Sequence, residues 1–109
     1  MMDARFLRNE MLWGKEGQAR LARAHVILFG LGGVGSYVAE CLARSGIGEL
    51  TLVDGDTVAL SNLNRQLEAL SSTIGLPKAE AVARRIAEIN PEAVLHPMQA
   101  LYNADNRAL

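Results

Sequence analysis

The sequence of 109 residues has a single cysteine and almost no net charge. One cysteine cannot form an internal disulfide and cannot by itself make a zinc site. A formal charge of −1 gives no electrostatic reason to expect nucleic-acid binding. No apolar run is long enough to cross a membrane, and residues 1–12 lack the apolar centre of a signal peptide. A cytoplasmic globular protein is therefore the default expectation.

What the sequence does contain is a βαβ pattern with a glycine-rich turn. An apolar run at His25–Phe29 precedes Gly30-Leu-Gly-Gly-Val-Gly, a helical pattern follows, and a second apolar run ends at Asp54. Backbone N–H groups in such a turn, with the amino end of the next helix, bind phosphate. A carboxylate at the end of the second strand is typical of contact with ribose hydroxyls. The pattern predicts a nucleotide site and fits NAD, FAD or ATP, whereas a ligand-free glycine turn is the weaker interpretation.

The four glycines of the turn have different expected tasks. Gly30 makes the turn itself, and Gly32 and Gly33 let an anion approach the backbone. Gly35 lets the helix pack close to the strand.

The helix after the turn is predicted to end at Gly46, since glycine commonly follows the last helical turn. Apolar residues at helical spacing predict its buried face. That face consists of Val34, Tyr37, Val38, Cys41, Leu42 and Ser45. Cys41 would then be a core residue, because a reactive thiolate needs exposure and a cationic neighbour.

The remaining elements complete a parallel sheet. Two short helices are expected over Asp3–Trp13 and Lys15–Ala24, a third over residues 77–89, and the start of another over residues 103–109. Val94–Met98 reads as a third strand, and Pro97 favours an edge position or the end of that strand. The order β-α-β-α-β with short links predicts an α/β fold, a Rossmann-like doubly wound parallel sheet.

Polar residues gather after the second strand. Ser61-Asn-Leu-Asn-Arg-Gln ends at Gln66, and its Asn, Arg and Gln side chains suit phosphates and bases better than turns. Lys78 stands in the first turn of the next helix, where the helix dipole disfavours a cation. A bound anion would remove that cost, so we favour a functional lysine over a surface one. Asp56 is either a turn residue or a further nucleotide contact, and both interpretations stay open.

Several motifs along nearly the whole chain carry a family resemblance. They are Gly30-Leu-Gly-Gly-Val-Gly-Ser, Ser45-Gly-Ile-Gly, Leu52-Val-Asp-Gly-Asp, Asn62-Leu-Asn-Arg-Gln and Gly75-x-Pro-Lys. Together they resemble the adenylation fold of the ubiquitin-activating-enzyme superfamily, which includes the ThiF-type adenylyltransferases of sulfur carriers. Within it, Asn62-x-Asn-Arg-Gln, Ala43-Arg-Ser-Gly-Ile-Gly and Leu12-Trp-Gly most resemble the tRNA threonylcarbamoyladenosine dehydratases.

The resemblance implies ATP rather than NAD as the nucleotide. Carried over by position, Asp54 would hold the ribose hydroxyls, and Asn62, Arg65 and Lys78 would surround the triphosphate. The charged donors would stabilise negative charge as pyrophosphate leaves. Arg8 matches an arginine that in relatives enters the partner subunit's site, which implies a homodimer. The resemblance also implies tRNA as substrate, a sulfur-transfer protein as partner, and Mg²⁺.

Members of the superfamily that this chain resembles continue well beyond the position of Leu109. The aspartate that binds magnesium in them lies in that later part. The expected organisation is an N-terminal helical segment, residues 1–24, and the first half of an adenylation domain, residues 25–109. The strand His25–Phe29 would then have an open apolar edge, so we expect the isolated chain to be poorly stable or to self-associate. Three alternatives to a threonylcarbamoyladenosine dehydratase stay open. The chain could belong to an adenylyltransferase of sulfur carriers, or it could be a non-catalytic module for nucleotide binding or dimerisation. An NAD oxidoreductase is the least favoured alternative.

Overall fold

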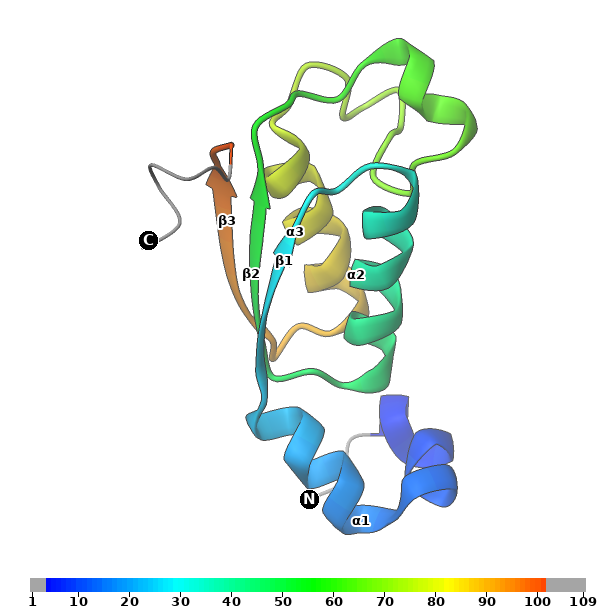
Figure 1. Cartoon of the computed structure of the whole chain (residues 1–109). Helices are drawn as coiled ribbons and strands as arrows, with labels where there is room; N and C mark the ends of the chain where they lie inside the picture. Colours follow the sequence, from blue (N-terminus) through cyan, green and yellow to red (C-terminus); the bar gives the residue numbers. More distant parts are fainter. Residues whose placement is uncertain (1–3, 102–109) are drawn as a thin grey trace.

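A computed structural model describes residues 4–101 of the chain and has an α/β architecture (Figure 1). The helix expected over residues 103–109 lies outside this range. In chain order the elements are η1 (Ala4–Phe6), α1 (Leu7–Arg23), β1 (His25–Phe29), α2 (Gly33–Ser45), β2 (Glu49–Asp54), η2 (Leu60–Asn64), α3 (Lys78–Ile89) and β3 (Val94–Gln99). Within the described range no helix is long and apolar enough to span a membrane.

The three strands form one parallel sheet in the order β1-β2-β3, which confirms the predicted α/β class. Leu52 in the central strand pairs with Leu28 on one side and with Pro97 on the other. Pro97 therefore lies in an edge strand, as predicted. The other edge of the described sheet is β1, where Ile27 and Phe29 are each about half exposed.

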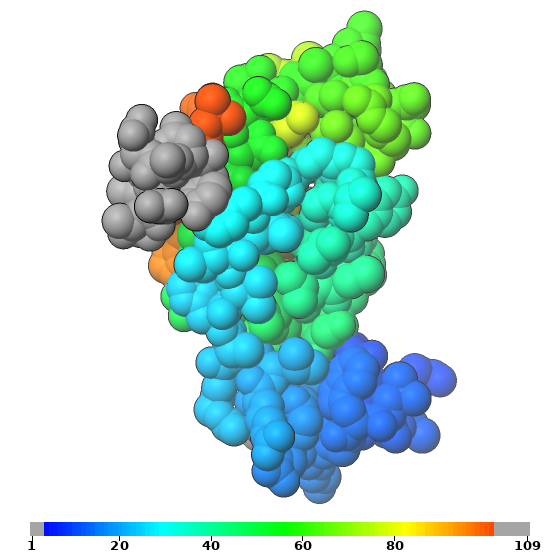
Figure 2. All heavy atoms as spheres, viewed as in Figure 1, coloured from blue at the N-terminus to red at the C-terminus, as the bar shows by residue number. Residues whose placement is uncertain are grey.

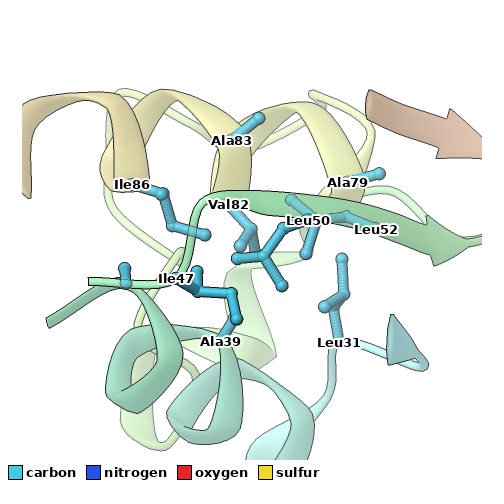
Figure 3. Close-up of a cluster of buried hydrophobic side chains, with 10 residues drawn as sticks. Leu31, Ala39, Ile47, Leu50, Leu52, Ala79, Val82, Ala83 and Ile86 are labelled. Carbon is cyan, nitrogen blue, oxygen red and sulfur yellow. The ribbon is translucent and has the colours of Figure 1, made fainter. Parts of the chain in front are cut away.

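The core lies between the sheet and the two helices α2 and α3, which cover the same face (Figure 1). Leu50 and Leu52 of β2 are fully buried against these helices. Figure 3 shows their side chains meeting small and branched residues from both helices and from the loops. Those partners are Leu31, Ala39, Ile47, Ala79, Val82, Ala83 and Ile86.

The buried face of α2 differs from the prediction. Ser36, Ala39 and Ala43 are buried, whereas Cys41 is exposed. The large apolar residues Val34, Tyr37 and Val38 are 81%, 53% and 39% exposed, and Leu42 is partly buried. The prediction that Cys41 is a core residue was therefore wrong. The reason is packing: Gly35, Ala39 and Ala43 follow one another at four-residue spacing, and only this small-residue stripe lets α2 lie close to the sheet.

The close approach is greatest at Gly35. A Cβ at this position would overlap the carbonyl oxygen of Gly30 in the preceding turn. A Cβ on Gly33, two residues earlier, would meet no atom within 4 Å. At the other end of α2, Gly46 adopts the left-handed conformation, with φ of 92°, and ends the helix as predicted.

The N-terminal segment packs at the amino ends of the strands, far from the glycine turn (Figure 1). Gly14 breaks α1 with a φ of 77°, which separates two helical pieces where the sequence predicted two short helices. Gln18 is buried; its Nε2 donates to the carbonyl of Ser45 and its Oε1 accepts from Trp13 Nε1, both at 2.8 Å. In the space-filling view α1 forms a lobe at this end of the molecule (Figure 2).

An ion pair joins α2 to α3. Arg85 donates from Nε to Glu40 Oε1 at 2.7 Å and from Nη2 to Glu40 Oε2 at 3.1 Å, and Arg44 adds a bond from within α2. The Glu40 side chain is only 13% exposed. The Arg85 guanidinium beside it, helped by Arg44, holds the pKa of Glu40 below its ordinary value. The pair fixes the relative position of the two helices that carry the core.

Replacing Gly35 with alanine should destabilise the protein. Because the new Cβ overlaps the Gly30 carbonyl, the turn or the helix must shift, and we expect the free energy of unfolding to fall by about 1–3 kcal/mol. Gly33→Ala in the same turn is the matched control and should change it by less than about 1 kcal/mol. Urea unfolding measures both variants. Equal stability of the two would show that the close contact does not constrain the turn.

Glu40→Gln should lower stability in a pH-dependent way. The pKa of Glu40 is lower in the folded than in the unfolded protein, so its contribution is present above the unfolded pKa of about 4.3 and is lost as pH falls through the folded pKa. Near pH 7 we expect Glu40→Gln to lower the free energy of unfolding by about 1 kcal/mol, and this difference should shrink below about pH 4. Glu80→Gln, which removes an exposed pair with Arg84, is the control. A pH-independent difference between Glu40→Gln and the unaltered chain would argue against the ion pair as its source.

Candidate functional site

All predicted site residues except Arg8 gather where the parallel strands β1 and β2 end. Four segments meet there: the glycine turn, the residues after Asp54, the loop that contains η2, and the amino end of α3 (Figure 1). Ligands of open α/β sheets bind at this carboxyl edge. The fold therefore places the strongest sequence motifs on one side of the molecule.

The glycine turn presents the amino end of α2. Gly30 has a φ of 89°, and its N–H donates to the carbonyl of Val53 at 2.9 Å, which ties the turn to β2. No side chain caps the amino end of α2, where Gly32 is the N-cap residue, and a Cβ on Gly33 would meet no atom within 4 Å. The first N–H groups of a helix have no partner inside it and carry its positive dipole end. The turn can accept an anion at this position.

Asp54 links the turn to the next segment. Its Oδ2 accepts from the N–H of Leu31 and its Oδ1 from the N–H of Asp56, each at 2.7 Å. A carboxylate oxygen has two lone pairs, so each oxygen can accept one further bond, such as one from a ribose hydroxyl. Asp56 is exposed, and its carbonyl accepts from the N–H of Lys78 at 3.0 Å. For Asp56 the structure thus shows a turn role and a link to α3.

The polar residues of Ser61–Gln66, here called the polar patch, divide into a buried and an exposed part. Asn62 is buried, and its Oδ1 accepts from the N–H of Ala59 at 2.8 Å. Arg65 is exposed and donates from Nη1 to the Ser61 carbonyl and to Asn64 Oδ1, both at 2.9 Å. A guanidinium has five N–H donors, so Arg65 retains donors for an anion. Asn62 shapes the loop, and Arg65 is available at its surface.

Lys78 is the first residue of α3 and is only 7% exposed. The segment around it is fixed by a bridge between Thr57 and Pro77 and by the Asp56 carbonyl. Among residues 4–101, no hydrogen bond and no ion pair within 4.0 Å holds the Lys78 ammonium. A buried cation at the positive end of a helix is unfavourable unless an anion joins it. The surface-lysine interpretation is therefore wrong, and the location fits an anion site.

Two buried side chains lie in the same loop: Gln66, which belongs to the polar run predicted from the sequence, and Glu68, which no sequence pattern indicated. Glu68 is 1% exposed, and neither of its carboxylate oxygens has a hydrogen-bond partner. Gln66 is 7% exposed, its Oε1 is also without a partner, and its Nε2 lies near Gly32. Burial raises the pKa of Glu68, the backbone N–H of Glu68 itself and the Lys78 charge act against this rise, and Asp54 adds to it. No periodicity marks this loop, so the sequence carried no signal for the burial of Glu68.

Arg8 does not join these groups within its own chain. It is exposed on α1, at the end of the molecule formed by the amino ends of the strands. Its expected role in a partner's site stays a prediction. Between residues 4 and 101, no three His, Cys, Asp or Glu side chains are grouped to hold a metal ion.

Three of the relatives found by comparison with known proteins illustrate the similarity. A tRNA threonylcarbamoyladenosine dehydratase of Bacillus subtilis is 49% identical over 100 residues, which are 92% of this chain and 39% of that protein. A molybdopterin-synthase adenylyltransferase of Salmonella typhimurium is 43% identical over 90 residues, 83% of this chain and 36% of that protein. The crystal structure of the Escherichia coli tRNA N6-threonylcarbamoyladenosine dehydratase TcdA in complex with ATP superposes with a TM-score of 0.93 at 45% identity, over 95% of this chain and 43% of that chain.

The chain thus spans about two fifths of the length of these relatives. The identities of 43–49% are well above the level at which only the fold is shared. The family model described as "ThiF family" matches residues 6–109. The chain belongs to the ThiF family, an ATP-dependent family of adenylating enzymes and dehydratases.

Proposed function

We propose that this chain is the nucleotide-binding part of an enzyme that uses ATP to adenylate a carboxylate. The observation that carries the proposal is the pairing of two anion-receptive elements: the uncapped amino end of α2 and the largely buried Lys78 side chain at the amino end of α3. Asp54, at the end of β2, accepts hydrogen bonds from Leu31 in the glycine turn and from Asp56, whose carbonyl binds the N–H of Lys78. A nucleotide offers the matching chemistry, since its phosphates are anionic and its ribose hydroxyls donate to a carboxylate.

In the proposed reaction the substrate carboxylate attacks the α-phosphorus of ATP. A bond forms between the carboxylate oxygen and the α-phosphorus. The bond between the α-phosphorus and the oxygen that bridges it to the β-phosphate breaks, and pyrophosphate leaves. Lys78 and Arg65 would stabilise the negative charge that builds up on the phosphates. The N–H groups of Gly32 and Gly33 would hold a phosphate oxygen, and Asp54 would orient the ribose. Orientation of both reactants supplies much of the rate enhancement in such a transfer.

The preferred substrate is the carboxylate of N6-threonylcarbamoyladenosine in tRNA. Two of the relatives reported above carry that name, at 49% and 45% identity. In that reaction an internal nitrogen displaces AMP from the acyl-adenylate and closes a ring. The runner-up is the carboxylate of a sulfur-carrier protein, which the 43% identity to the molybdopterin-synthase adenylyltransferase supports. Both substrates form an acyl-adenylate, so the nucleotide site described here serves either.

Removing the Lys78 charge should weaken ATP binding. Calorimetric titration of the chain with ATP should give saturable binding, and Lys78→Met should lower the affinity about tenfold to a hundredfold, because one charge-assisted contact to phosphate is lost. The sequence has one other lysine, the exposed Lys15, so Lys15→Met is the matched control and should bind as the unaltered chain does. Asp54→Ala should also bind ATP more weakly than the unaltered chain does.

The alternatives are separated in the same experiment. NAD in place of ATP should not bind, and saturable NAD binding would support an oxidoreductase instead. Pyrophosphate exchange with threonylcarbamoyladenosine-containing tRNA, and in parallel with a sulfur-carrier protein, identifies the carboxylate. Folded protein that binds neither nucleotide would overturn the proposal that this chain holds ATP by itself.

A further inference from the structure

The Glu68 carboxyl is the least satisfied charged group in the described part of the chain. It is 1% exposed, and both oxygens lack a hydrogen-bond partner. Buried carboxylates are otherwise paired or hydrogen-bonded, because an isolated charge in an apolar environment is strongly unfavourable. Glu68 is therefore a feature that the fold alone does not explain.

The surroundings of Glu68 connect it to the proposed nucleotide site. The next residue, Ala69, packs with Val58 and with Ala81 of α3, one turn beyond Lys78. The charged groups that act on the carboxyl are Lys78, from the start of α3, and Asp54, from the end of β2. Burial and Asp54 favour the neutral acid, whereas the backbone N–H of Glu68 itself and the Lys78 charge favour the ionised carboxylate. The charge of Glu68 thus depends in part on how much of the Lys78 field reaches it.

We propose that Glu68 is a positioning residue that balances the Lys78 ammonium while the site is empty and takes up a proton from solvent when a polyphosphate joins that ammonium. This inference rests on the proposed function, since it assigns Lys78 to a phosphate. An added phosphate brings negative charge next to Lys78 and Asp54. The ionised form of Glu68 then becomes less favourable, and the neutral acid replaces it.

Two consequences follow from this coupling. Binding of a polyphosphate is accompanied by uptake of up to one proton. Affinity falls as pH rises above the titration midpoint of Glu68 in the free protein, by about tenfold per pH unit at most for one coupled proton. Glu68 acts through Lys78 and touches no reacting atom in this scheme.

The first measurement uses the ligand-free chain. Carboxyl-¹³C glutamate labelling follows each glutamate by NMR as pH is changed, with the Glu68 signal assigned from its absence in Glu68→Gln. The Glu68 carboxyl should titrate above the ordinary glutamate pKa of about 4.3. Lys78→Met should move the Glu68 midpoint further upward. A Glu68 midpoint at the ordinary glutamate value, or one that does not respond to Lys78→Met, would overturn the inference.

The second measurement adds the anion. ATP and inorganic tripolyphosphate are titrated calorimetrically in two buffers of different ionisation enthalpy, which gives the number of protons taken up. The unaltered chain and Glu88→Gln should take up a proton, whereas Glu68→Gln should take up none and should bind with little pH dependence. Proton uptake that persists in Glu68→Gln would refute the role of Glu68.

The two anions separate this inference from the proposed function. If tripolyphosphate binds with Glu68-dependent proton uptake and ATP does not bind, the nucleotide proposal fails and the coupling of Glu68 to an anion at Lys78 stands. If ATP binds but neither anion changes the Glu68 carboxyl, the nucleotide proposal stands and the role of Glu68 is wrong. Glu68→Gln removes only a buried charge. At a pH above the titration midpoint of Glu68, this variant should therefore need at least as much urea to unfold as the unaltered chain does.

Discussion

The close contact between Gly35 and the carbonyl of Gly30 is the constraint on which this structure depends. Because position 35 has no Cβ, the helix α2 starts directly against the turn that follows β1. That contact sets the rotation of α2, and the residues one and two turns later on the same side, Ala39 and Ala43, meet the sheet. The same contact keeps the amino end of α2 next to Asp54, where a phosphate and a ribose can be held together.

Charge in the site is arranged around two helix amino ends. The first, at Gly33, is open, and the second begins with the buried Lys78. Asp54 and Glu68 supply the opposite charge, but Asp54 is bonded to two backbone N–H groups whereas Glu68 has no partner. The two carboxyl groups are thus unequal: hydrogen bonds from backbone N–H groups hold Asp54 in place, whereas Glu68 responds to what surrounds Lys78.

The large apolar side chains that α2 leaves uncovered form a second feature of the molecule. Val34, Tyr37 and Val38 line a shallow groove together with the exposed Cys41. Ile27 and Phe29 of the edge strand β1 are also half exposed. Apolar surface of this kind is consistent with the expectation that the isolated chain self-associates, and that expectation stays a prediction.

Local signals in the sequence determined the strands, the turn and the ends of the helices. His25–Phe29 has the bounds that the sequence predicted, and Gly46 ends α2, because a short apolar run bounded by a glycine turn and a left-handed glycine depend on neighbouring residues alone. The motifs likewise placed Asp54, Arg65 and Lys78 at one edge of the sheet. Tertiary structure decided the rest: helical periodicity identifies apolar faces but not which one meets the sheet, so the buried face of α2 was mispredicted. The burial of Lys78 and Glu68 also follows from packing between segments distant in sequence, which no local pattern encodes.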